Sequence, residues 1–144
     1  MTTSSLSDSL HQLMHSYRTQ LRNGIEQQQI SLPITQIRAL KGVCRLPACT
    51  ARSIADAMKK DKAQITRVIN ELAASGLIEK RDNPKDQRSQ LLVPTKAGKK
   101  MLQKIDAIEA QAAAHMTRNL SEEEISTFRR ICDTMINSAA ANKD

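Results

Sequence analysis

The hydrophobic spacing of the chain changes abruptly at Gly76, and this change limits the possible folds more than any other feature. Residues 61–75 carry apolar side chains at intervals of three and four, which is the period of an amphipathic helix. Residues 77–81 and 89–93 are short runs that suit strands, and residues 82–86 between them have the composition of a turn. The sequence therefore predicts a helix that is followed directly by a β-hairpin.

Helical spacing recurs over most of the remaining chain. The only aromatic residues are Tyr17 and Phe128, so the core must be aliphatic, which suits packed helices better than a large β-sandwich. We predict a mainly α fold with a small β-hairpin. The further apolar stripes run through residues 6–25, 34–43, 54–58, 101–112 and 125–136.

Residues of the types that cap helices stand at the predicted helix ends. The predicted order is three helices, a fourth, a basic hairpin and two more helices. N-terminal caps are expected at Thr50 and Thr95, in a capping box of Ser121 with Glu124 and in a similar pair of Asp61 with Gln64, with Pro33 in the first turn of the second helix and Gly76 as a left-handed C-terminal cap.

The positive charge is concentrated in the centre of the chain. The formal net charge is +7, and residues 50–100 hold 12 basic and six acidic residues, whereas the rest of the chain is nearly balanced. A basic centre between near-neutral flanks is typical of a surface that binds a polyanion. A solvated face without a partner is the alternative.

Residues 50–59 and 61–75 are two predicted helices joined by a tight turn, which is the arrangement of a helix-turn-helix. The polar side of the second helix can contact base edges or phosphates, and the basic hairpin after it fits a wing whose arginine enters a minor groove. An ordinary amphipathic helix with a solvated polar side is the alternative. The candidate DNA contacts are Thr50, Lys62, Ala63, Gln64, Thr66, Arg67 and Asn70 in the helices and Arg81, Lys85, Asp86 and Arg88 in the hairpin.

Asp86 is an unexpected acid on a surface of this kind. It lies two residues before Arg88, and positions i and i+2 of an extended hairpin share a face. We therefore expect the Asp86 carboxylate to hold the Arg88 guanidinium in one orientation by a bidentate ion pair.

Several motifs, in the same order, resemble the MarR family of winged helix-turn-helix regulators. Residues 61–72 and 76–80 resemble its recognition helix and first wing strand. Asp-Gln-Arg-Ser at 86–89 matches its Asp-x-Arg wing signature, and Thr-Lys-Ala-Gly at 95–98 matches the Thr-x-x-Gly that opens its next helix. Residues 120–124 resemble the start of its last helix, so the resemblance covers nearly the whole chain.

The resemblance implies a single domain, 1–144, that works as a homodimer. Its winged helix-turn-helix would occupy about 34–95, and its dimerisation helices about 5–30 and 96–140. The resemblance also implies binding of double-stranded DNA at a pseudo-palindromic operator, with residues 61–75 in a major groove and Arg88 in a minor groove. It implies a repressor that a small aromatic or phenolic effector, an oxidant or a metal releases. A monomer whose terminal helices pack on their own domain is the alternative to the dimer.

Pro94 departs from the family, which often has leucine there. Because proline has no N–H to donate to a ladder, we expect the second strand to end one residue early.

Two cysteines are candidates for redox sensing. Cys44 and Cys49 could form a disulfide if their Cα atoms approach within about 7 Å. Arg45 and Arg52 nearby could lower the pKa of a thiol. The alternative is that they are small buried hydrophobic residues, which is the more frequent role of cysteine. Cys132, in the last apolar stripe, is expected in the core.

His11 and His15 have a spacing that can share one metal ion. The sequence positions no third ligand, so we expect two surface histidines and predict neither a metal site nor a cofactor.

Other classes of protein fit the sequence less well. It contains no Gly-rich phosphate loop or nucleophile elbow, so we do not expect an enzyme. A winged-helix adaptor that binds proteins is the alternative function, and it predicts an uncharged or acidic recognition face. Residues 1–9 do not form a signal peptide, and no run approaches the roughly 18 apolar residues of a membrane span. We expect a cytoplasmic protein with reduced thiols.

Overall fold

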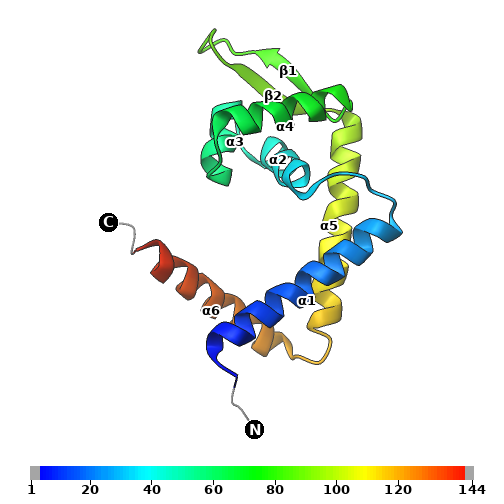
Figure 1. Ribbon diagram of the computed structural model, residues 1–144, viewed down its shortest axis with the longest axis vertical. Coiled ribbons are helices and arrows are strands. Elements are labelled where there is room, and N and C mark those ends of the chain that lie inside the picture. The colour runs from blue at the N-terminus through cyan, green and yellow to red at the C-terminus, as the bar shows by residue number, and fades with distance from the viewer. Residues whose placement is uncertain (1–3, 142–144) are drawn as a thin grey trace. The chain divides into compact units, whose positions relative to one another are not determined.

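In a computed structural model of the protein, the described residues, 4–141, form six helices and one two-stranded antiparallel sheet (Figure 1). The prediction of a mainly helical chain with a hairpin after its fourth helix is confirmed. Within these residues no helix is both long and apolar enough to cross a bilayer. In chain order the elements are α1 (Leu6–Gln27), α2 (Ile34–Arg45), α3 (Ala51–Met58), α4 (Lys62–Ala74), β1 (Ile78–Asp82), β2 (Gln90–Pro94), α5 (Lys96–Met116) and α6 (Glu122–Ala140).

The chain divides into two compact units. Unit 2 is residues 21–109 and contains α2, α3, α4 and the hairpin; unit 1 is residues 1–20 and 110–144. The expectation that residues 1–144 act as one domain stays a prediction.

An aliphatic core holds α2, α3, α4 and the hairpin of unit 2 together. Figure 1 shows the three helices grouped side by side, with the hairpin next to α4. The stripe predicted for α4 is buried as expected, and this leaves the polar side chains of α4 on its outer face. Ile34, which was expected in the α2 stripe, is instead 70% exposed at the first residue of that helix. The core includes Leu40, Val43, Ile54, Ile65, Ile69, Leu72, Ile78 and Leu92.

The helix ends agree with the sequence at most positions. A capping box joins Ser121 to Glu124 as predicted, and Thr50 caps α3 in a box with Ser53. Asp61 is the N-cap residue of α4, but its side chain makes no capping hydrogen bond, so the predicted pair with Gln64 is wrong. Pro33 is the N-cap residue of α2 and so lies just before the first turn in which it was predicted. Gly76 has the left-handed conformation that was predicted for it, with a φ of 77°.

The hairpin begins and ends one residue later than predicted, with Ile78 opposite Pro94 and Asp82 opposite Gln90. The expectation that Pro94 shortens β2 is wrong. Thr95 donates its N–H to the Leu77 carbonyl at 3.1 Å, so Leu77 and Thr95 stand opposite each other at a hydrogen-bonded position of the ladder. Pro94 therefore falls at a non-hydrogen-bonded position, where an antiparallel ladder needs no N–H.

The start of α5 is fitted tightly against the residue before β1. Thr95 caps α5 as predicted, because its Oγ1 accepts from the Gly98 N–H at 3.1 Å, and it also donates to the Gly76 carbonyl at 2.6 Å. A Cβ atom at Gly98 would lie 2.0 Å from the Leu77 carbonyl oxygen. Only glycine fits here without a backbone shift.

The helices of unit 1 carry uncovered apolar stripes. Neither α1 nor α6 contains a buried residue, and Cys132 is only half-buried, so its expected place in the core is wrong for a single chain. The stripes remain open to another surface. Their exposed members are Leu6, Leu10, Leu13, Met14 and Tyr17 before and within α1, and Leu120, Phe128, Ile131, Met135 and Ile136 before and within α6.

Replacing Gly98 by alanine should lower the free energy of unfolding by about 1–3 kcal/mol, because the new methyl group forces the backbone of Leu77 away. Urea denaturation followed by circular dichroism measures this change. Lys100→Ala, at an exposed site on the same helix, is the control and should stay within about 0.5 kcal/mol of the wild type. Equal stability of the two variants would contradict the close fit.

Candidate nucleic-acid interface

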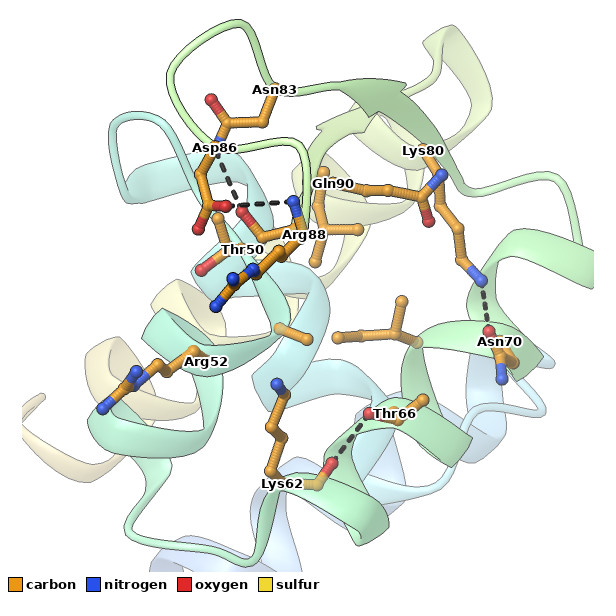
Figure 2. Close-up of a pocket in the computed structure, with 14 residues that line it drawn as sticks. Thr50, Arg52, Lys62, Thr66, Asn70, Lys80, Asn83, Asp86, Arg88 and Gln90 are labelled. Carbon is orange, nitrogen blue, oxygen red and sulfur yellow. Dashed lines mark hydrogen bonds between the residues drawn. The ribbon is translucent and has the colours of Figure 1, made fainter.

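A cavity of about 600 Å³ opens in unit 2 between the start of α3, the outer face of α4 and the hairpin (Figure 2). We call residues 78–94, the two strands with their loop, the wing. The cavity brings together six of the eleven candidate contacts, from three separate elements. These six are Thr50, Lys62, Thr66, Asn70, Asp86 and Arg88.

The other five candidates are exposed but do not line the cavity. Ala63, Gln64 and Arg67 lie on α4, and Arg81 and Lys85 lie in the wing. Arg81 forms an ion pair with Glu79, with its Nη2 atom 3.4 Å from Oε2. Because both side chains are well exposed, this pair contributes little to stability. The candidates therefore divide into a group around the cavity and a group outside it.

The α4 side of the cavity consists of residues spaced by four. Lys62, Thr66 and Asn70 share one face of the helix because residues i and i+4 are stacked. Figure 2 shows the Lys62 side chain extending from α4 toward the wing. The Thr66 hydroxyl donates to the Lys62 carbonyl at 2.8 Å, so its proton is used within the helix.

Two basic residues that line the cavity were not among the candidates. Arg52 lies in the first turn of α3, and Lys80 lies in β1 and donates through its Nζ atom to Oδ1 of Asn70. The strand period gives a signal for Lys80, because it shares a face with the buried Ile78 and so points toward α4. Arg52 gave no such signal, since its role depends on how the wing folds back beside α3.

The tip of the wing is held by hydrogen bonds from side chains to the main chain. Asp86 Oδ1 accepts from the main-chain N–H of Arg88 at 2.9 Å, and Asn83 Oδ1 accepts from the N–H of Lys85 at 3.0 Å. Asn83 also donates to the Ser89 hydroxyl at 3.1 Å. Asparagine and aspartate commonly stabilise turns in this way.

The predicted ion pair between Asp86 and the Arg88 guanidinium is wrong. Residues 83–89 form consecutive turns instead of an extended hairpin, so positions i and i+2 do not share a face there. The carboxylate binds the main chain of Arg88 instead of its side chain. Within residues 4–141 the Arg88 guanidinium has neither an ion pair nor a hydrogen bond to a side chain.

The wing is attached to the segment that precedes α3. Leu92 donates its N–H to the Cys49 carbonyl at 2.8 Å, and its side chain is buried in the core of unit 2. This contact sets β2 beside Thr50 and brings the wing tip over the start of α3.

The thiols of Cys44 and Cys49 are not activated. Both are free; Cys49 is buried and Cys44 half-buried. Burial raises the pKa of Cys44 and outweighs the opposing effect of the Arg45 charge. Burial also raises the pKa of Cys49 and outweighs the hydrogen bond from Ser53. The expected lowering of a thiol pKa is therefore wrong, and these residues resemble small hydrophobic core residues.

A comparison with protein-family models matches residues 30–89 to the MarR family. These residues, fewer than half of the chain, are similar to the MarR family. The matched residues run from just before α2 to the end of the wing loop, so they include α3, α4 and most of the cavity.

The chain is also similar to two curated proteins and to two solved structures. The chain is 31% identical to the HTH-type transcriptional regulator BilQ of Clostridium symbiosum (strain WAL-14163) over 78 residues. These residues make up 54% of each of the two chains. It is 33% identical over 76 residues to BilQ of Clostridioides difficile (strain CD3), which is 53% of this chain and 51% of that one. The chain thus spans about half the length of the curated relatives it matches.

The solved structures show a MarR-like fold along nearly the whole chain. A crystal structure of MarR has a TM-score of 0.78 and 23% identity, with 98% of this chain and 95% of that chain covered. The MepR–DNA complex of S. aureus has a TM-score of 0.77 and 19% identity, with 94% of this chain and 99% of that chain covered.

Substitution of Asp86 should separate its acceptor role from its charge in the wing. Asp86→Ala removes the acceptor for the Arg88 N–H and should speed exchange of that amide about fivefold, as expected for loss of roughly 1 kcal/mol. Asp86→Asn keeps Oδ1 and should exchange like the wild type. Hydrogen exchange followed by NMR measures both, and a fast-exchanging asparagine variant would show that the negative charge of Asp86 is needed as well as its acceptor oxygen.

Proposed function

We propose that this protein is a transcriptional regulator of the MarR family that binds double-stranded DNA. The observation that carries the proposal is the basic cavity beside α4. Four cationic side chains line it from α3, α4 and the wing: Arg52, Lys62, Lys80 and Arg88. A DNA duplex is a dense line of phosphate charges, and its neutralisation by lysine and arginine supplies most of the binding that does not depend on sequence. The two BilQ relatives are named transcriptional regulators, and the MepR structure is a DNA complex.

In the proposed complex, α4 enters a major groove and the wing reaches the neighbouring minor groove. A major groove is wide enough for a helix and presents a distinct pattern for each base pair. Gln64 and Arg67 have side chains that can read such patterns, while the free guanidinium of Arg88 suits a narrow minor groove. Arg81 and Lys85 lie in the same wing and can contact phosphates.

The proposed active form is a homodimer that pairs through α1 and α6. The support is the uncovered apolar stripe on each of these helices, which a second copy would bury. A two-fold symmetric dimer places two copies of α4 on one face of the duplex. It therefore requires a pseudo-palindromic operator with half-sites about 34–36 Å apart.

We further propose that DNA binding represses transcription and that a small aromatic or phenolic molecule releases it. These two parts rest on the family resemblance. The raised pKa of the Cys44 and Cys49 thiols favours such a molecule over an oxidant, because the thiolate is the reactive form. Such a regulator acts in the cytoplasm and needs no enzymatic activity.

The wild type should prefer the DNA upstream of its own gene over a scrambled duplex by at least about tenfold, or roughly 1.4 kcal/mol. Arg88→Ala should weaken binding and reduce the slope of log affinity against log salt concentration by about one for each subunit of the bound dimer. Lys104→Ala, an exposed lysine on α5 outside the cavity, is the control and should bind like the wild type. Fluorescence anisotropy across a salt series measures all three.

Absence of binding even at low salt would overturn this function and favour the protein-binding adaptor. Weak binding without sequence preference would show only that the DNA upstream of its own gene is not the target, and the proposal of DNA binding would stand.

Phe128→Asp should convert the dimer to a monomer, because it places a charge in the middle of the exposed stripe of α6. Ser126→Asp adds the same charge on an exposed site of α6 outside the stripe and should leave the dimer intact. Light scattering after size-exclusion chromatography gives the two masses. A dimeric Phe128→Asp variant would exclude pairing through this stripe.

A further inference from the structure

We propose that Lys80 of β1 and Asn70 of α4 act as a pair that reads a guanine in each half-site of the operator. Lys80 is the positioning residue of the pair, because it fixes the Asn70 amide so that the two side chains together present hydrogen-bond donors. The inference rests on the proposed entry of α4 into a major groove, and it names the base that one position of this helix selects.

Asn70 lies on the side of α4 that points away from the core. Each residue of a helix turns the chain by about 100°, so the position of a side chain can be counted from the buried stripe of α4. On this count the series Lys62, Thr66 and Asn70 drifts round the helix, and Asn70 is the member nearest to the line opposite the stripe. A helix enters a groove with the side opposite its buried stripe. The exposed Asn70 side chain is therefore directed toward base edges, whereas Lys62 lies on the flank of the helix.

Lys80 reaches Asn70 from the first strand of the wing. It lies opposite Leu92, whose side chain is buried in the core of unit 2, so both residues are on the face of the hairpin that packs against the helices. Its Nζ atom donates to Oδ1 of Asn70 (Figure 2). Because both side chains are exposed, this bond replaces bonds to water and adds little to the stability of the fold. Its main effect is to fix the direction of the amide.

The Lys80 ammonium determines which end of the Asn70 amide faces it. A lysine has three N–H donors and no acceptor, so only the amide oxygen can be its partner. Figure 2 shows the amide nitrogen of Asn70 on the side away from Lys80. Within residues 4–141 this nitrogen has no hydrogen bond, and the ammonium has no ion pair and no second side-chain bond. The pair therefore presents N–H donors from both side chains.

These donors match the major-groove edge of guanine. Guanine presents two acceptors there, N7 and O6, whereas adenine presents the acceptor N7 beside the N6 amino donor. An unrestrained asparagine suits adenine, because its oxygen accepts from N6 while its NH₂ group donates to N7. The Asn70 oxygen keeps a second lone pair, but a donor that approached it would also approach the charge on Lys80, which repels it. The pair should therefore reject adenine, and cytosine with its N4 donor for the same reason.

A phosphate oxygen is the other acceptor that these donors fit. A phosphate accepts from many directions, so a fixed amide would bring little advantage there. The position of Asn70 opposite the buried stripe also favours the floor of the groove over its edge. The two contacts have different consequences, because a base contact affects one position of the half-site whereas a phosphate contact affects all sequences alike.

Selection of duplexes from a random pool tests the assignment without knowledge of the operator. The wild type should enrich guanine at one position of each half-site, and replacing that G·C pair by A·T should weaken binding about tenfold in fluorescence anisotropy. Lys80→Met frees the Asn70 amide, so the preference for guanine over adenine should fall to about one or reverse. Lys80→Arg keeps a cationic donor and should retain the preference. Asn70→Ala should lose most of it.

Lys85→Met is the matched control, because it removes the same charge from the same wing. Lys85 is exposed in the wing loop, and its loss should weaken binding to every duplex by a similar factor without changing the preferred bases. If Lys80→Met behaved in the same way, with guanine still preferred, the pair would contact phosphate and the inference would be overturned. A Lys80→Met variant that selects the same bases with undiminished affinity would overturn it as well.

Modified bases at the selected position test which atoms are read. A 7-deazaguanine lacks the N7 acceptor and should weaken binding of the wild type about tenfold, while Asn70→Ala should lose this sensitivity. Inosine lacks only the minor-groove amino group of guanine and should bind like guanine, since both major-groove acceptors remain. Sensitivity of the wild type to inosine and not to 7-deazaguanine would exclude this reading of the major groove. A wild type that enriches no duplex from the pool would instead refute the proposed function.

Discussion

The arrangement of the candidate interface depends on one main-chain hydrogen bond, from the Leu92 N–H to the Cys49 carbonyl. A hairpin of two short strands has little stability of its own. Here β2 is tied to the segment just before α3, and the Leu92 side chain enters the core of unit 2. The cations of the wing are therefore held at a fixed place relative to α3 and α4. Without this tie they would be carried by a mobile arm.

The polar groups around the cavity are organised before any ligand arrives. The loop of the wing satisfies its own main chain through Asn83 and Asp86, and Lys80 orients Asn70. A side chain that is already oriented loses less conformational entropy on binding. The acid in the wing, which was unexpected in a basic surface, thus shapes the loop that presents Arg88.

Local sequence rules predicted those features that depend on neighbours along the chain. The stripe of α4, the cap at Thr50, the box at Ser121 and the left-handed cap at Gly76 all involve residues within about one turn of each other. The rules failed where the outcome depends on tertiary placement or loop angles. Asp86 was assigned to the wrong partner because its loop is not extended.

Dependence on tertiary placement also explains why two site residues were missed and why the pKa of the cysteines was predicted wrongly. Arg52 and Lys80 join the cavity only because the wing folds beside α3 and α4. The pKa of Cys44 could not be inferred from its arginine neighbour, because burial is the larger effect. For α1 and α6 the sequence predicts apolar stripes but no covering surface, and within one chain those stripes stay exposed.

The uncovered stripes of unit 1 have a consequence for how the protein responds to its own abundance. When two copies cover these faces, part of the folding free energy becomes a binding free energy and grows with the logarithm of concentration. The melting temperature then rises with the amount of protein, whereas unit 2, with its own aliphatic core, gains less from pairing. A cell that makes few copies would hold a population that is less stable, and therefore more readily degraded, than one that makes many.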